Sequence, residues 1–199
     1  MAELSLNLPS PIQSITFENH KFFLKRDDLI HPDFSGNKAR KFHDFLTHGF
    51  PSVKKIVSYG SAQSNAMYSL SVLAQLKGWK FEYHVDHIAG YLQDTPHGNY
   101  RAALENGTLF REQGARSREQ FDDDVLFVEE GGRQKEAEHG IKLLAEEIIS
   151  WQKEQGIETL NIFLPSGTGT TALFLQKSCS LLSAPCSLKM NVFTTPCVG

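Results

Sequence analysis

The spacing of apolar residues predicts a chain in which short strands alternate with helices. Lys55–Tyr59 has the composition of a buried strand, and residues 64–77 follow it with the apolar spacing of an amphipathic helix that ends at Gly78. The same order recurs along the chain. Further strands are expected at residues 79–85, 108–111, 125–128, 160–164 and 190–195, and further helices at residues 38–48, 99–105, 134–155 and 171–177. This order predicts an α/β fold with doubly wound parallel sheets.

The first part of the chain has a different pattern. Residues 4–11 should be extended, because Pro9 and Pro11 prevent a helix. Residues 14–17 and 21–25 are predicted to form two short strands on either side of a turn at residues 18–20. Near the other end, residues 178–187 are rich in serine and are expected to form a loop before the last strand.

Ser35-Gly36-Asn37-Lys38 delivers one lysine to the start of a predicted helix. A helix N-terminus carries partial positive charge, so it is a poor place for a cation. A desolvated amine in positive potential can lose its proton and form a Schiff base, which makes Lys38 a candidate for chemistry. The alternative, favoured by this segment alone, is a surface lysine in a basic helix with Arg40 and Lys41.

Two later turns change that balance. Ser58–Asn65 is small and polar and lies between a strand and a helix, and Ser166-Gly167-Thr168-Gly169-Thr170-Thr171 occupies the same kind of position. Glycines let backbone amides converge on one point, and a helix N-terminus adds favourable potential, so the second turn predicts an anion site. The alternative for both turns is ordinary helix capping by serine and threonine.

In this order and spacing, the three motifs resemble those of the pyridoxal-phosphate enzymes of the tryptophan synthase β superfamily, or fold type II. More narrowly, the chain resembles the 1-aminocyclopropane-1-carboxylate deaminase/D-cysteine desulfhydrase family from about Pro9 to its last residue. The resemblance implies that the cofactor is pyridoxal 5'-phosphate and that Lys38 is both its Schiff-base lysine and, once freed, a catalytic base.

The resemblance also implies roles for the two turns. Asn65 would hydrogen-bond the phenolic oxygen of the cofactor. Ser64 would approach the substrate carboxylate and the reacting face, with Gln63 beside it as a further substrate-binding residue. The phosphate would be held by Gly167, Thr168, Gly169, Thr170 and Thr171.

The family fold implies two domains. Residues 1–51 and 157–199 would form a discontinuous large domain, and residues 52–156 a small α/β domain. The returning part of the large domain is only one strand, one helix and one further strand, so the larger domain is expected to be incomplete at its C-terminal side. By resemblance, the chain would form a homodimer.

Three functions stay open. The first is a deaminase or lyase acting on a small amino acid, of the 1-aminocyclopropane-1-carboxylate or D-cysteine type, which yields a 2-oxo acid and ammonia. The second is an inactive remnant that at most binds the cofactor, favoured by the early end of the chain and by Ala66, where many relatives have histidine or glutamine. Arg133-Gln134 departs from the family in the same way, because serine-asparagine is common there. The third is a phosphate- or nucleotide-binding module outside the family.

Composition excludes several other classes. The chain has 199 residues, of which 40% are hydrophobic and 22% charged, and a formal net charge of −3. No apolar run approaches the ~20 residues that span a bilayer, and no secretory signal opens the chain, so a cytoplasmic protein without a membrane partner is expected. Near-neutral charge gives no support for nucleic-acid binding. Neither the cysteines nor the clustered histidines have zinc-site spacing, so no metal is expected; these residues are Cys179, Cys186, Cys197, His84, His87 and His97.

Overall fold

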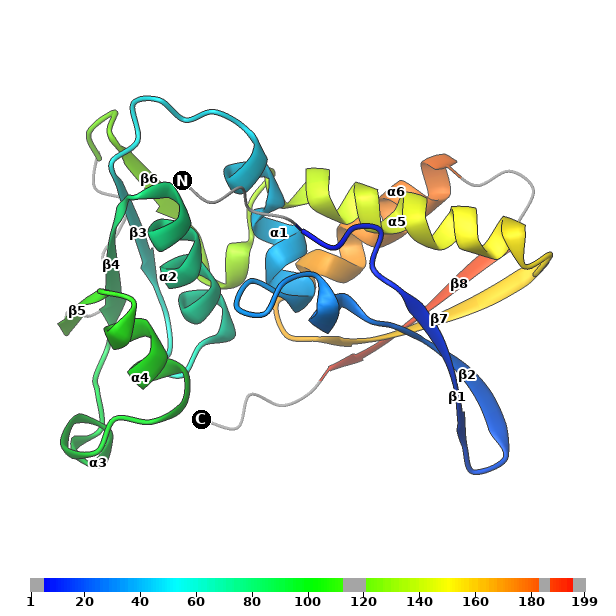
Figure 1. The fold of residues 1–199 in the computed structure, drawn as a ribbon, viewed down its shortest axis with the longest axis horizontal. Coiled ribbons are helices and arrows are strands. Elements are labelled where there is room, and N and C mark those ends of the chain that lie inside the picture. The colour runs from blue at the N-terminus through cyan, green and yellow to red at the C-terminus, as the bar shows by residue number, and fades with distance from the viewer. Residues whose placement is uncertain (1–5, 113–120, 183–186, 195–199) are drawn as a thin grey trace.

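The computed structural model describes residues 6–112, 121–182 and 187–194, and for residues 187–194 it describes the backbone alone. Strands and helices alternate through most of the chain (Figure 1). The strands are β1 (Ile12–Phe17), β2 (His20–Lys25), β3 (Lys55–Tyr59), β4 (Lys80–Val85), β5 (Leu109–Glu112), β6 (Val125–Val128), β7 (Thr159–Ser166) and β8 (Ser187–Thr194). The helices are α1 (Gly36–Thr47), α2 (Asn65–Lys77), α3 (Gly90–Asp94), α4 (Gly98–Glu105), α5 (Ala137–Glu154) and α6 (Thr170–Leu182), with short 3-10 turns at η1 (Asp27–Leu29) and η2 (Glu130–Gly132).

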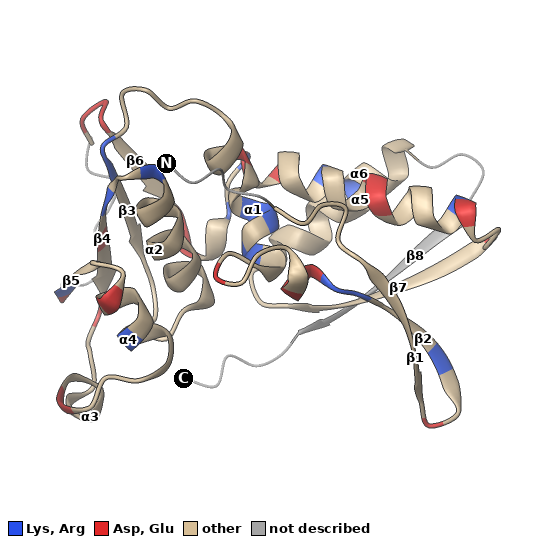
Figure 2. Ribbon diagram, viewed as in Figure 1, with Lys and Arg blue, Asp and Glu red and all other residues tan. Residues whose placement is uncertain are grey.

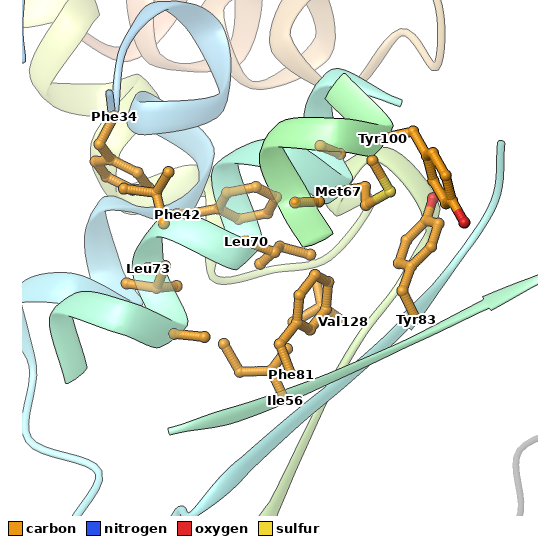
Figure 3. Packing of buried hydrophobic residues seen from close by; sticks show 14 of the residues in the cluster. Phe34, Phe42, Ile56, Met67, Leu70, Leu73, Phe81, Tyr83, Tyr100 and Val128 are labelled. Carbon is orange, nitrogen blue, oxygen red and sulfur yellow. The ribbon is translucent and has the colours of Figure 1, made fainter. Parts of the chain in front are cut away.

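Four parallel strands form the first sheet, in the order β5-β4-β3-β6. Helices α2 and α4 lie on the side of this sheet that faces α1 (Figure 1). Met67 and Leu70 of α2 pack above Ile56, Phe81 and Val128 of the strands, and all five side chains are buried (Figure 3). Burying strands under helices in this way is the usual arrangement of a parallel sheet, and the predicted α/β class with parallel strands is confirmed.

A second, smaller core lies between α5, α6 and β7, and β7 pairs in parallel with β8. The apolar faces of α5 and α6 pack on each other and on Leu160 and Ile162 of β7. The predicted domain boundary at residue 156 stays a prediction, but the packing puts α5 with these C-terminal elements.

Helix α1 lies between the two cores (Figure 1). Phe42 and Phe45 belong to the first core, while another face of α1 packs closely on α5. The crossing requires a glycine on α5, because a Cβ at Gly140 would lie 2.0 Å from the backbone oxygen of Arg40. A residue with any side chain at this position would force the two helices apart.

The N-terminal strands form an antiparallel hairpin with the predicted turn. Glu18 and Asn19 both have positive φ, as the tightest hairpin turns require. One face of the hairpin touches α5 through an edge-to-face contact between Phe23 and Trp151. On the other face Phe17 is 63% exposed, so the hairpin is covered on one side only.

Most predicted elements are confirmed, and the corrections concern their ends. Helix α6 continues to Leu182, so the expected serine-rich loop from residue 178 is wrong over its first five residues. Helix α5 begins at Ala137, three residues after the predicted start at residue 134. Helix α3 was not predicted. Residues 4–5, Cys186, Thr195 and Cys197 lie outside the described residues.

Within the described ranges, no helix is both long enough and apolar enough to cross a membrane.

Candidate active site

Lys38 lies in the first turn of α1, where the motif Ser35–Lys38 was expected to deliver it. Ser35 is the N-cap residue, but its side chain makes no capping hydrogen bond. The Lys38 side chain is half-buried, and its amine has no hydrogen bond or ion pair to any other described residue. Burial lowers the pKa of Lys38 below its ordinary value. An amine that is desolvated without a counter-ion is easier to deprotonate, which is the property that a nucleophilic lysine needs.

Lys41 is a second lysine of the site that the sequence did not single out. Its side chain is only 2% exposed, and its Nζ donates to the backbone oxygen of Gly131 at 2.9 Å and to Thr168 Oγ1 at 3.3 Å. Burial, reinforced by the charges of Lys38 and Arg133, lowers the pKa of Lys41 to about 7. Residues three apart on a helix lie on the same side, so the spacing of Lys38 and Lys41 could have indicated that Lys41 belongs to the site.

The glycine-threonine turn lies where β7 ends and α6 begins, as predicted. The Cβ positions of Gly167 and Gly169 have no atom within 4 Å, so the backbone there borders open space. Thr168 and Thr170 exchange a hydrogen bond between their hydroxyls at 3.0 Å. Thr171 Oγ1 is buried and has no partner among the described residues. These hydroxyls and the amides at the start of α6 form a set of donors suited to an anion.

The turn at Gly131 and Gly132 brings the end of β6 against these groups. Both glycines have positive φ, and a Cβ at Gly131 would lie 2.8 Å from Thr168 Cγ2. A Cβ at Gly132 would lie 2.8 Å from the Phe42 ring. Only glycine permits this approach, which places Gly131 between Lys41 and the glycine-threonine turn.

Ser64 lies at the start of α2 and acts as its N-cap. Its Oγ accepts hydrogen bonds from the backbone amides of Ala66 at 3.2 Å and Met67 at 3.4 Å. The buried phenol of Tyr83 is a further neighbour of Ser64, and burial raises the pKa of this phenol above its ordinary value. A Cβ at Gly60 would lie 2.7 Å from the Tyr83 hydroxyl and 3.3 Å from Glu130, so this turn packs closely on the segment that leads to Gly131.

Gln63 and Asn65 are exposed, and their side chains contact the beginning of α4. Gln63 donates to the backbone oxygen of His97 at 3.2 Å and accepts from the backbone amide of Tyr100 at 3.3 Å. Among the described residues, neither side chain is held by Lys38 or by the glycine-threonine turn. The structure places Lys41 against the glycine-threonine turn, with Lys38 near enough for its charge to lower the Lys41 pKa. The Ser64 turn approaches the same region through Tyr83 and Glu130.

Arg40 is as deeply buried as Lys41, but its charge is paired. Its guanidinium donates to the Asp27 carboxylate at 2.7 and 3.1 Å, to both Glu147 oxygens at 2.8 Å and to Ser10 Oγ at 3.2 Å. Although burial disfavours its charge, hydrogen bonds from Arg40 and Lys25 hold the pKa of Glu147 below its ordinary value. The alternative of a surface basic helix, raised for Lys38 with Arg40 and Lys41, does not hold for Arg40 and Lys41, because both are buried. Figure 2 shows Lys and Arg positions, coloured blue, on α1 in the middle of the molecule.

A cavity of about 550 Å³ lies elsewhere, between the N-terminal segment and α5. Leu8, Ile12 and Trp151 contribute to its wall together with Lys25 and Glu147. None of the predicted site residues lines it, and its deepest charges are satisfied by one another at a Lys25–Glu147 distance of 2.6 Å. We therefore place the candidate active site at the lysine cluster. Within the described part of the chain, no group of three or more histidine, cysteine or acidic residues is arranged to hold a metal ion.

The fold is that of known enzymes. An ACC deaminase homologue matches with a TM-score of 0.65 and 16% identity, over 96% of this chain and 72% of that one. The apo diaminopropionate ammonia lyase of Escherichia coli matches with a TM-score of 0.65 and 14% identity, over 94% of this chain and 59% of that one. A pyridoxal 5'-phosphate-dependent aspartate racemase gives a TM-score of 0.64 and 15% identity, over 93% of this chain and 56% of that one.

These matches establish the fold class: the chain has the α/β architecture of the tryptophan synthase β-like, fold type II enzymes. The chain spans little more than half the length of the ammonia lyase and the racemase. No protein-family model matches the sequence, and no curated protein matches it in a sequence search.

Proposed function

We propose that the chain binds pyridoxal 5'-phosphate through Lys38 and that it acts on a small amino acid as a deaminase or lyase. The observation that carries this proposal is a pair of desolvated lysine amines without a carboxylate partner among the described residues: Lys41 bonds to Thr168 of the glycine-threonine turn, and the charge of Lys38 acts on Lys41. Groups with a shifted pKa cluster at functional sites, because burial and nearby charges there adjust the pKa to the chemistry required. The fold shared with the ACC deaminase homologue and the aspartate racemase supports the same class of cofactor chemistry.

The residues present fit the cofactor at three points. Its phosphate would be held by the turn from Gly167 to Thr171, with open space at the glycines, an unpartnered buried hydroxyl at Thr171 and the amine of Lys41 as counter-charge. Lys38 would hold the cofactor covalently, and Asn65 would donate to its phenolic oxygen. When bound, pyridoxal phosphate serves as an electron sink for a carbanion formed at the substrate Cα.

The chain's own residues would handle the proton and the substrate. Lys38 would act as the base, because burial lowers its pKa and so favours the neutral amine. The N-terminus of α2, with Ser64 and Asn65, would attract the substrate carboxylate, since helix N-termini favour anions. Gln63 would border the same site. We propose substrates of the 1-aminocyclopropane-1-carboxylate or D-cysteine type, with a 2-oxo acid and ammonia as products.

A non-catalytic cofactor-binding protein is the second candidate, and two observations favour it. Ser64 already uses its hydroxyl to cap α2. Ala66, two residues after Ser64, has a side chain that cannot transfer a proton. Both features would leave cofactor binding intact while removing proton transfer on that side of the site.

Titration with pyridoxal phosphate separates these candidates. We expect visible absorbance to appear at stoichiometric cofactor, followed by release of ammonia from D-cysteine or from 1-aminocyclopropane-1-carboxylate. Absorbance without any ammonia would establish the non-catalytic candidate. No absorbance, together with binding of inorganic phosphate to the chain, would overturn the proposal in favour of a phosphate-binding module.

A further inference from the structure

The amide of Asn99 lies between two residues of the predicted substrate turn. Its Nδ2 donates to the backbone oxygen of Gln63 at 3.0 Å and to Asn65 Oδ1 at 2.7 Å. Asn99 is half-buried at the second position of α4, and it does not cap its own helix, which has His97 as N-cap without any side-chain hydrogen bond. Its side chain is therefore directed at the turn from Gln63 to Asn65.

These two contacts fix the direction of both amides. A backbone oxygen can only accept, so the Asn99 atom that contacts Gln63 is the NH2 group. The second hydrogen of that NH2 group points at Asn65, and the Asn65 atom that receives it is therefore the oxygen. Asn65 is left with its own NH2 group turned away from Asn99. The usual ambiguity between oxygen and nitrogen in a side-chain amide is removed at both residues.

We propose that Asn99 is a positioning residue that turns Asn65 so that it presents hydrogen-bond donors, and no acceptor, to the cofactor. This inference rests on the proposed function. An exposed asparagine such as Asn65 could otherwise present either its oxygen or its nitrogen. Held by Asn99, Asn65 favours a ligand atom that accepts, which for pyridoxal phosphate is the deprotonated phenolic oxygen. The site thereby selects one protonation state of the bound cofactor.

Asn99→Asp tests this directly, because it replaces the donor by an acceptor of the same shape. The introduced carboxylate would draw the NH2 group of Asn65 towards itself and leave Oδ1 facing the phenolic oxygen. We expect the phenolic pKa of the bound cofactor, read from absorbance against pH, to rise by about one unit, a tenfold change in that equilibrium. Asn99→Ala removes the restraint without reversing it, and should raise this pKa by a smaller amount.

A matched control lies at the other end of the same helix. Asn106 Nδ2 donates to Ser71 Oγ at 2.9 Å, away from the turn at Gln63. Asn106→Ala removes a side-chain amide from α4 and should leave the phenolic pKa unchanged. In an Asn65→Ala background, Asn99→Asp should have no further effect on this pKa, because Asn99 acts through Asn65. A full effect in that background would overturn the positioning role.

Side-chain amide NMR of the protein without cofactor tests the orientation independently. We expect slow solvent exchange of the Asn99 NH2 hydrogens and fast exchange at Asn65. Fast exchange at Asn99 would overturn the proposal at once. If the unmodified chain shows no absorbance with cofactor, the proposed function falls and the selection of the phenolic state falls with it. If it binds normally and Asn99→Asp leaves the phenolic pKa unchanged, only the present inference falls.

Discussion

Helix α1 carries buried cations on two of its sides, and the two sides differ in whether carboxylates pair with the cations. Arg40 is 1% exposed and meets two carboxylates, those of Asp27 and Glu147, each at two hydrogen-bond distances. Lys41, the next residue, is 2% exposed and meets a backbone oxygen and a threonine hydroxyl. Lys38, one turn earlier, is half-buried and has neither partner.

The difference separates a structural charge from a functional one. A buried cation is tolerated when counter-charges and hydrogen bonds offset the loss of hydration. Arg40 has them, and it ties the N-terminal segment and α1 to α5. The two lysines lack counter-charges among the described residues, so burial lowers the pKa of both. An incoming anion would supply what they lack, and this is why we assign binding to their side of the helix.

The largest expected effect is on stability, at Arg40. Arg40→Met would leave the partly buried carboxylate of Asp27 without its counter-charge, and Glu147 with Lys25 alone. We expect a loss of about 3–5 kcal/mol in the free energy of unfolding, the range for breaking one side of a buried ion pair. Urea unfolding of the variant measures this loss. Unchanged stability would contradict the distinction between Arg40 as a structural charge and the lysines as functional ones.

The next effect is on cofactor affinity, at the glycine-threonine turn. Gly169→Asp places a carboxylate against the phosphate, and we expect binding weaker by at least ~2 kcal/mol, about one charge-assisted hydrogen bond. Gly169 has φ +76, so strain accompanies this change. Gly167→Asp avoids it, because Gly167 is not in the left-handed region and has open space around it. Cofactor titration should show weaker binding for both Gly169→Asp and Gly167→Asp. Gly49→Asp, a surface control, should bind the cofactor with unchanged affinity.

Lys41→Met distinguishes the two sides of α1 most sharply. An apolar side chain of similar length replaces a desolvated amine, so we expect unfolding stability to be unchanged or higher. Cofactor affinity at pH 6 should fall about tenfold, equivalent to ~1.4 kcal/mol, because a counter-charge of the phosphate is removed. Lys153→Met, at an exposed position of α5, should change neither quantity. A destabilised Lys41→Met protein with normal affinity would contradict the assignment.

The smallest effect is a pH dependence with a defined sign. Lys41 has a pKa of about 7 in the folded chain, lowered by burial and by the charges of Lys38 and Arg133 from its ordinary value of 10.5. Between these values the unfolded chain binds more protons, so stability should rise with pH from about 7 to 10.5. Sulfate can serve as the test anion, because its own charge does not change over this pH range and any change in its affinity comes from the protein. Its affinity should decline several-fold from pH 7 to 8, and Lys41→Met should remove most of that decline.

The sequence predicted the parts of this site that depend on local chemistry. Turns with glycine, serine and threonine between a strand and a helix are local patterns, and the Ser35–Lys38 and Ser166–Thr171 turns were found from them. The burial of Arg40 and Lys41 was not predictable from local sequence. Arg40 is paired with Glu147 of α5, 107 positions further along the chain, and Lys41 bonds to Gly131, 90 positions further along. Asn99 was missed for the same reason, since its partners Gln63 and Asn65 belong to a different helix start.

The helices show the same limit. The apolar spacing of residues 134–155 predicts a helix with one buried face, and α5 has that face. Spacing does not say which neighbour covers the face, and in the structure α6 and β7 cover it. Helix α6 extends beyond the predicted end. Ser178 and Cys179 are both buried, and Cys179 belongs to the core that α6 shares with α5, so burial overrides the weak helix preference of serine and cysteine.

Borohydride reduction of the chain after incubation with pyridoxal phosphate, followed by peptide mapping, tests the central claim most directly. The reduced cofactor should be found on Lys38 alone, and Lys38→Ala should abolish labelling while urea unfolding shows an intact fold. Lys41 should remain unlabelled, because it serves the phosphate. Label on Lys41 in the unmodified chain, or a stoichiometric label that survives Lys38→Ala, would contradict the account.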